Sequence, residues 1–294
     1  MYYMRIFILL ILASILSSGN LFAQGGWDTK GDVALNASQT SFTNWATGGD
    51  NSITGNSFLN YSANFKRYKM TWDNSINLGI GYMKQGEAIF FKTDDRIAFS
   101  SKYGREAFEH WYYTGLIGFR SQFAEGYKSI ADSTKVSNFM APGYITVSIG
   151  MDYKPVDNLT ILMSPVAGRT TFVMDTTLSN QGAYGVLPGE NIRYEFGGIV
   201  KIEYLLNIME NVSYKTSLEL FSNYLKKPQN INMNWDHVVS LKINNFISAN
   251  IHLTMIYDDD IKISYDSTGD GINDKKGPKL QLRNIMGIGL GYRF

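Results

Sequence analysis

The sequence predicts an all-β fold, a closed antiparallel up-and-down transmembrane β-barrel of about twelve strands. Three observations predict it: strand-length segments with alternating apolar and polar residues, connections that alternate between short and long, and a last strand that ends on an aromatic residue. A period of two is typical of strands whose two faces meet different surroundings. Short turns alternating with long loops are typical of barrels that cross an outer membrane.

The first 23 residues predict a signal peptide. Arg5 supplies a positive charge, residues 6–16 form an apolar core, and Ala23 stands at a cleavage site. The apolar run is too short to span a bilayer as a helix, which disfavours a membrane anchor. We therefore expect an exported protein with a signal peptide over residues 1–23 and one barrel domain over residues 24–294.

Each predicted strand separates its apolar residues from its polar ones. In residues 191–205, for example, Ile192, Tyr194 and Phe196 share one face, and Arg193 and Glu195 share the other. Most segments reach the roughly 9–11 residues that a tilted membrane strand needs. The predicted strands are 27–39, 54–67, 71–83, 94–103, 110–123, 141–153, 159–171, 191–205, 211–224, 232–243, 247–257 and 279–294.

The connections and the strand ends fit the same topology. Short turns are expected at 67–70, 154–158, 207–211 and 244–247, with a longer exception at 104–109. Long polar loops are expected at 40–53, 84–93, 124–140, 172–190 and 258–278, with a middling one at 225–231. Aromatic residues near strand ends predict interfacial girdles; they are Tyr68, Trp72, Tyr82, Trp111, Tyr153, Tyr204, Tyr224 and Trp235.

The last segment, NIMGIGLGYRF, alternates apolar residues with glycines and ends on Tyr292 and Phe294. It resembles the terminal strand that the barrel-assembly machinery of outer membranes recognises, so these two aromatics are a candidate assembly signal. An open edge with so apolar a face would invite aggregation, and pairing with the first strand removes it. An even number of strands places both termini on the periplasmic side.

Charged residues on the polar faces predict the lining of the lumen. Both signs occur in similar numbers, so the sequence leaves two interpretations open: a pore lining that selects solutes by charge, or side chains that pair with one another and fill a narrow interior. The glutamates of 191–205 lie on the strand beside Lys215 and Glu219, which predicts cross-strand pairs. The candidate lining residues are Arg120, Arg193, Glu195, Lys201, Glu203, Lys215, Glu219 and Arg283, with Lys66, Asp73, Asp152 and Lys242.

Composition disfavours several function classes. The formal net charge is +1, so nothing indicates nucleic-acid binding, and the absence of cysteine excludes thiol nucleophiles, disulfides and cysteine-ligated metals. The three histidines do not combine with a nucleophile: His110 lies at a predicted turn, His237 on the lipid-facing side and His252 in the lumen. We expect no enzyme and no organic cofactor; a membrane-lipid enzyme using His237 is the weaker alternative.

One loop resembles a calcium site. Asp266, Asp270 and Asp274, with Gly271, follow the spacing of oxygen-ligand calcium loops. Thr268 replaces a usual ligand and Gly277 stands where a glutamate usually closes the loop. The alternative is an ordinary hydrophilic surface loop. The sequence therefore leaves two interpretations of this loop open: a structural calcium site or a hydrophilic surface loop without a metal.

The stretch SQTSFTNWATGGDNS, residues 38–52, could be a phosphate-binding loop or a hairpin loop. No helix follows Gly48 and Gly49, which disfavours phosphate and favours a tight turn. Together with YDDDI and GPKLQLRNIMGIGLGYRF, the markers Asn44, Trp45, Gly48 and Gly49 resemble a family of unknown function of outer-membrane proteins from Bacteroidetes-type bacteria. The resemblance implies an outer-membrane barrel and no established activity.

We therefore expect an integral protein of a Gram-negative outer membrane, in contact with lipid and lipopolysaccharide and inserted by the barrel-assembly machinery. The expected role is a small-solute channel or porin-like protein. The alternative is a non-conducting structural or accessory barrel that binds other envelope proteins in a larger outer-membrane complex.

Overall fold

The structure is a computed structural model that describes the chain except residues 1–25, 43–49, 130–131, 245 and 271–273. The predicted signal peptide (1–23) and the loop markers Asn44, Trp45, Gly48 and Gly49 lie outside the described residues. The structure therefore does not test the signal peptide or the turn at Gly48 and Gly49, and both stay predictions.

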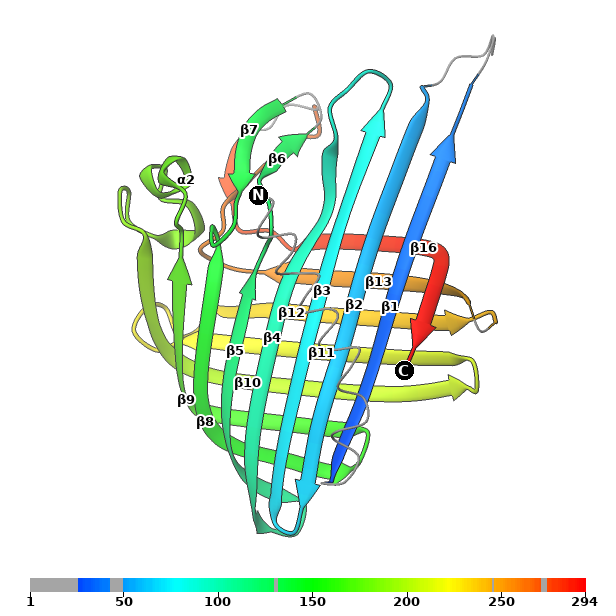
Figure 1. Cartoon of the computed structure of the whole chain (residues 1–294). Coiled ribbons are helices and arrows are strands. Elements are labelled where there is room, and N and C mark those ends of the chain that lie inside the picture. The colour runs from blue at the N-terminus through cyan, green and yellow to red at the C-terminus, as the bar shows by residue number, and fades with distance from the viewer. Residues whose placement is uncertain (1–25, 43–49, 130–131, 245, 271–273) are drawn as a thin grey trace, which may run out of the picture.

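Twelve strands form one closed barrel in which all neighbours are antiparallel and, apart from the pair that closes it, follow one another along the chain (Figure 1). The prediction of a closed, twelve-stranded, all-β barrel is confirmed. The strands are β1 (Trp27–Thr40), β2 (Ser52–Arg67), β3 (Met70–Gln85), β4 (Phe91–Phe108), β5 (Trp111–Ser121), β8 (Gly143–Val156), β9 (Leu159–Phe172), β10 (Ile192–Met209), β11 (Val212–Asn223), β12 (Ile231–Lys242), β13 (Ile247–Tyr257) and β16 (Gln281–Arg293).

The barrel is polar inside and apolar outside. In β8, Thr146, Ser148 and Asp152 are buried, whereas Val147 and Ile149 between them are exposed. A water-soluble barrel reverses this pattern, because burying apolar groups drives its folding. The alternation therefore has the sense expected of a barrel whose wall faces lipid and whose interior faces water.

The connections differ in length at the two ends of the barrel. β4 continues to Phe108, so only two residues join it to β5; the expected longer turn at 104–109 is wrong, because the ladder with β5 extends through Glu106. The long connections carry small elements gathered at the upper end in Figure 1. They are β6 (Gly126–Ser129), β7 (Asp132–Ser137), α2 (Thr176–Asn180), η2 (Ala183–Gly185), β14 (Ile263–Tyr265) and β15 (Lys275–Gly277). Among the described residues, no helix has the length and apolarity to cross a membrane.

The barrel closes between β1 and β16, over a short ladder from Asp32–Arg293 to Asn36–Gly289. Beyond it, Gly31 and Phe294 exchange two backbone hydrogen bonds of 2.7 and 2.9 Å. The Phe294 ring occupies the space that a side chain at position 31 would need. A glycine under an aromatic ring on the neighbouring strand is a known way to fix strand register, so this pair helps to set the closure.

Aromatic side chains gather near the short turns. Trp27 contacts Trp72 with ring centroids 5.7 Å apart, and Trp111 contacts Tyr153 at 4.7 Å and Phe108 at 5.7 Å. Rings with an apolar body and a polar tip are enriched where a membrane wall meets water. Three of the predicted girdle residues, Trp72, Trp111 and Tyr153, thus lie in one band.

Candidate functional site: the barrel lumen

The lumen contains a cavity of about 1120 Å³. Asn207 and Ser213, beside the short turn that joins β10 to β11, line one end of it. Tyr144 and Asp258, next to the long connections, line the other end. The cavity therefore extends along most of the barrel, from the level of the short turns to that of the long loops.

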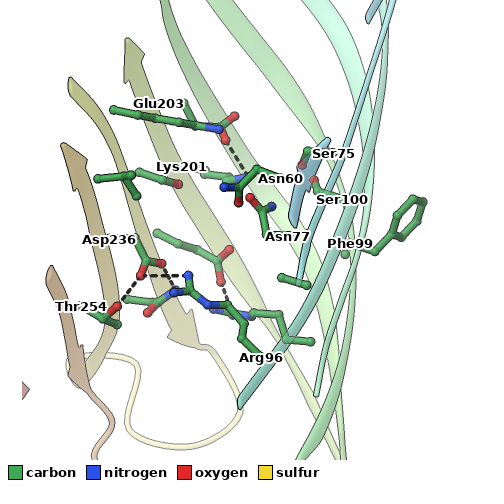
Figure 2. A pocket seen from close by; sticks show the side chains of 18 of the residues that line it. Asn60, Ser75, Asn77, Arg96, Phe99, Ser100, Lys201, Glu203, Asp236 and Thr254 are labelled. Carbon is green, nitrogen blue, oxygen red and sulfur yellow. Dashed lines mark hydrogen bonds and ion pairs between the residues drawn. The ribbon is translucent and has the colours of Figure 1, made fainter. Parts of the chain in front are cut away.

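One side of the cavity carries uncharged polar groups. Asn60, Ser75, Asn77 and Ser100, from β2, β3 and β4, point into it (Figure 2). In the same view Phe99, the neighbour of Ser100, points away from the lumen. Amides and hydroxyls both donate and accept hydrogen bonds, so this side can replace part of the hydration shell of a polar solute.

The other side carries most of the charges that the sequence assigned to the lumen. The structure places Arg120, Lys201, Glu203, Lys215, Glu219 and Arg283 along the cavity. Arg193 and Glu195 lie nearer the long loops, where Arg193 contacts Glu195 at 2.6 Å and Asp260 at 2.9 Å. The predicted lining residues thus occupy two levels of the interior.

The ion pairs differ from the expected cross-strand pairs. Glu203 binds Lys201 at 3.1 Å, and Glu219 binds Arg120 at 2.7 Å and Arg169 at 3.5 Å. On the neighbouring strand Ser217 is directly opposite Glu203, and Leu205 is opposite Lys215. Lys201 and Glu219 are directly opposite each other, but their closest ion pairs are with Glu203 and Arg120. Carboxylates therefore reach along their own strand or across the lumen for partners.

A second group of ion pairs lies towards the short turns. Lys102 binds Asp152 at 2.8 Å, and their side chains are only 6% and 1% exposed. Lys154 binds Asp73 at 2.7 Å beside them. Burial of two opposite charges is tolerated only with close pairing of this kind. These pairs link β3, β4 and β8 through the interior.

Several of these charged residues were absent from the predicted set. Asp94, Arg96 and Lys102 alternate with outward-facing Ile97 and Phe99, so the period of two contains the signal that identifies them. Arg169 is different, since β9 bulges between Ser164 and Ala167 where it pairs with β10. The bulge exchanges the two faces of the strand, and uninterrupted alternation from Ile161 onward would point Arg169 outward.

Two of the long connections pack together over the long-loop end. Asp175 caps α2 by accepting hydrogen bonds from the backbone of Thr177 and Leu178. The same carboxylate accepts from Asn138 at 3.0 Å and Lys135 at 3.1 Å, which ties the β6–β7 hairpin to the loop that carries α2. These hydrogen bonds, first that of Asn138, lower the pKa of Asp175 to about 2.

An apolar cluster supports this contact. Ala141, Val173, Leu178 and Val186 are buried against one another, and the Tyr184 hydroxyl donates to the Val136 carbonyl oxygen. We call residues 126–129 and 132–142, together with 173–191, the cap. It places Tyr184 on the lining of the cavity, so the cap borders the mouth of the lumen.

The YDDDI motif anchors the start of the last long connection. Asp260 binds Arg193 of β10 at 2.9 Å and Lys226 at 3.2 Å, and Asp259 lies 3.6 Å from Lys227. Burial raises the pKa of Asp258, which accepts the backbone N–H of Asp260. The acidic run therefore holds this loop to β10 and to the β11–β12 connection.

The predicted calcium loop is arranged by its own hydrogen bonds. Asp266 accepts from the backbone of Thr268 and Gly269, and Asp274 accepts from the backbone and hydroxyl of Ser267. Within the described part of the chain, no three potential ligands converge on a metal-binding arrangement. Calcium binding by Asp266, Asp270 and Asp274 stays a prediction.

The histidines occupy the predicted surroundings. His110 lies in the β4–β5 turn, and His252 is buried in the lumen wall, stacked on Phe58 at 5.1 Å. His237 is on the outer face, where the Tyr214 hydroxyl lies 2.7 Å from its Nδ1 and Trp235 packs at 4.6 Å. The partner of the His237 ring is thus a phenol rather than a serine.

A closed antiparallel barrel with an apolar wall, a polar interior and long connections at one end defines an outer-membrane β-barrel protein. Within that class, residues 37–127 match the model of a family described as a protein of unknown function, DUF3078. The match includes the first long loop and ends inside β6. No curated protein matches the chain.

Several solved barrels are similar to the whole chain. The translocator domain of the autotransporter NalP from Neisseria meningitidis is 10% identical, with a TM-score of 0.37, and the match covers 99% of this chain and 96% of that one. The COG4313 outer membrane channel from Pseudomonas putida F1 is 9% identical, with a TM-score of 0.40 and 94% and 98% covered. OmpF from Salmonella typhi, in complex with daunomycin, is 10% identical, with a TM-score of 0.27 and 91% and 97% covered.

Proposed function

We propose that the protein is an integral outer-membrane channel for small polar solutes. The observation that carries the proposal is the cavity of about 1120 Å³, which is lined mostly by polar and charged residues and runs from the short turns to the long loops. Roughly a dozen strands can enclose such a space, whereas eight-stranded barrels are filled by side chains. A solute crossing here would exchange water for the hydroxyls and amides of β2–β4 and the charges of β9–β11.

The membrane part of the proposal rests on the outer wall. Exposed apolar residues alternate with inward polar ones, and aromatic rings lie in a band near the short turns. In this arrangement lipid contacts the wall and lipopolysaccharide contacts its outer rim, with the short turns in the periplasm. Tyr292 and Phe294 would serve as the signal for the barrel-assembly machinery, and the motif resemblance supports a Bacteroidetes-type source.

The channel is tested by electrical recording from the purified barrel in planar bilayers. The wild type should give discrete conductance steps. Ser75→Trp, which places an indole in the lumen, should lower the unitary conductance, whereas Ile117→Trp on the outer wall should leave it unchanged. Folded protein without conductance steps would sink the proposal.

A non-conducting accessory barrel is the second candidate, and the cap favours it. The cap borders the mouth, and the pairs Lys102–Asp152 and Lys154–Asp73 cross the interior. In that case the loops would bind other envelope proteins, and the barrel would copurify with them in mild detergent. Deletion of residues 126–137 separates the two roles: the accessory role predicts loss of copurification, and the channel role predicts a higher conductance.

A further inference from the structure

We propose that the lumen prefers small anions, organic or inorganic, that carry a carboxylate or a phosphate. This inference rests on the proposed channel function and adds its charge selectivity. Four cationic side chains, Arg120, Arg169, Lys201 and Lys215, line one side of the cavity, and we call them the basic wall. Among the described lining residues, only the carboxylates of Glu203 and Glu219 come within 4.0 Å of these four cations, so four positive charges share two close carboxylates.

Glu219 shows the imbalance most directly. Its Oε1 serves two guanidinium groups at once, that of Arg120 at 2.7 Å and that of Arg169 at 3.5 Å. Arg169 is 7% exposed, and its buried Nε has no hydrogen-bond partner among the described residues. The Arg169 guanidinium packs over the Phe221 ring at 3.9 Å. Glu195, directly opposite Arg169 on β10, is bound to Arg193 at 2.6 Å. Arg169 thus shares its close carboxylate with Arg120 at the edge of the cavity.

Lys215 is the cation of the basic wall that has no close ion-pair partner among the residues that the structure describes. It is exposed on the cavity side of β11. Across the described residues no carboxylate comes within 4.0 Å of its ammonium group. Glu203, which is close enough to interact with it electrostatically, is bound to Lys201 at 3.1 Å. The Lys215 ammonium is therefore available to a solute.

The carboxylates on the rest of the lining do not come within 4.0 Å of the basic wall in the described part of the chain. The facing wall is neutral at Asn60, Ser75, Asn77 and Ser100 (Figure 2). Most charges elsewhere on the lining are paired. Arg283 is 37% exposed and its partner Asp94 is 0% exposed, whereas Arg96 and its partner Asp236 are 24% and 27% exposed. The other lining carboxylates are Asp32, held by Asn60, Asp95, held by Lys92, Asp236, beside Arg96, and Asp258 at the mouth.

The chemistry of the wall suits oxyanions. Guanidinium groups present planar forks of N–H donors to carboxylate and phosphate, and an ammonium group adds a mobile point charge. From Coulomb attraction with screening at moderate salt, we expect the local excess of positive charge along the basic wall to raise the permeability ratio of anions over cations to about 5.

The test is the reversal potential of the wild-type barrel in a potassium chloride gradient. We expect chloride to be preferred over potassium about fivefold, and Lys215→Gln to reduce the ratio to about 2. Lys128→Gln is the matched control, because Lys128 is an exposed residue of the β6–β7 hairpin that pairs with Asp132 at 3.3 Å, and it should leave the ratio unchanged. Inorganic phosphate should reduce the chloride current in the wild type more than in Lys215→Gln.

The outcomes separate the two proposals. A conducting barrel that is unselective or prefers potassium overturns the anion preference and leaves the channel in place. Anion preference that survives Lys215→Gln unchanged overturns the role of the basic wall. A folded barrel without any conductance overturns the channel function, and the anion preference with it.

Discussion

At the scale of single residues, the pair of Lys102 and Asp152 shows how the interior constrains the chain. Both side chains are almost fully buried, and the ammonium also lies 4.0 Å from Asp73 and Glu203. A buried charge that loses its partner is costly, whereas replacing both members of a pair by apolar groups is often tolerated. Replacing one member of the pair should therefore destabilise the protein more than replacing both.

We predict that Asp152→Asn destabilises the barrel by about 3 kcal/mol, because it leaves the Lys102 charge buried beside weaker partners. Guanidinium unfolding of the protein in lipid vesicles measures the loss. The double variant Lys102→Met with Asp152→Leu should recover most of it. Equal losses in the single and double variants would show that the pair itself stabilises the fold.

At the scale of elements, the closure of β1 on β16 depends on a backbone contact that admits no side chain. A Cβ at position 31 would lie 2.4 Å from the tip of the Phe294 ring. A Cβ at position 115, on the outer face of β5, would meet nothing within 4 Å. A larger side chain therefore fits at position 115 but clashes with Phe294 at position 31.

We predict that Gly31→Val reduces the yield of closed barrel on refolding in vitro, because the new side chain displaces Phe294. The yield is read from the heat-dependent change in gel mobility that closed barrels show. Gly115→Val is the control and should refold normally. Gly31→Val combined with Phe294→Ala should regain closure; failure of this pair to refold would mean that the ring itself, and not the clash, decides closure.

The cap gives a prediction about acid. The pKa of Asp175 is about 2 in the folded protein, against an ordinary value of 3.8. A lowered pKa means that the carboxylate contributes its full stabilisation above about pH 4 and loses it as the pH falls towards 2. Lys135 also binds Glu125, at 2.8 Å, and the pKa of Glu125 is lowered as well, so both carboxylates act in the same direction.

We therefore expect amide protection in β6 and β7 to fall between about pH 4 and pH 2, measured by hydrogen exchange corrected for intrinsic rates. Asp175→Asn keeps an N-cap but removes the charge. It should weaken protection at pH 7 and flatten the pH profile. An unchanged profile in this variant would assign the acid response to other groups.

At the scale of the whole molecule, the outer wall should behave as a lipid-facing surface. Ile149, at the middle of β8, is 66% exposed. We predict that Ile149→Lys destabilises the barrel in vesicles by about 2–4 kcal/mol, the cost of a cation on the lipid face near the midplane. Ile89→Lys, in the exposed β3–β4 connection, should cost far less. Equal effects of the two changes, measured by unfolding in vesicles, would contradict a membrane-embedded wall.

Much of the architecture was predictable from the sequence, because a strand between water and an apolar phase repeats with a period of two. All twelve barrel strands lie where alternation places them, within a few residues at most ends. Arg120, Glu219 and Lys215 face the lumen for the same reason. The local alternation is enough to predict whether a residue faces lipid or the lumen, because this depends only on which face of the strand the residue occupies.

Other features depend on relations between distant segments. Arg169 reaches the lumen only because β9 bulges against β10, and Arg120 of β5 binds Glu219 of β11 across the interior of the closed barrel. The hydrogen bonds of Asp175 join residues that are far apart in the chain. No periodicity encodes such pairings, so the charge balance of the lumen could be described only from the structure.

The short seam between β1 and β16 also has a consequence for the order of folding. Its partners, Asp32 with Arg293 to Asn36 with Gly289, are the most widely separated in the chain of all neighbouring strands. Contacts across long loops cost the most chain entropy and form late. The other eleven ladders join barrel strands that follow one another, so we expect them to assemble first into a curved sheet with two free edges. During that interval the edges are open to aggregation, and the molecule depends on its surroundings until the seam closes.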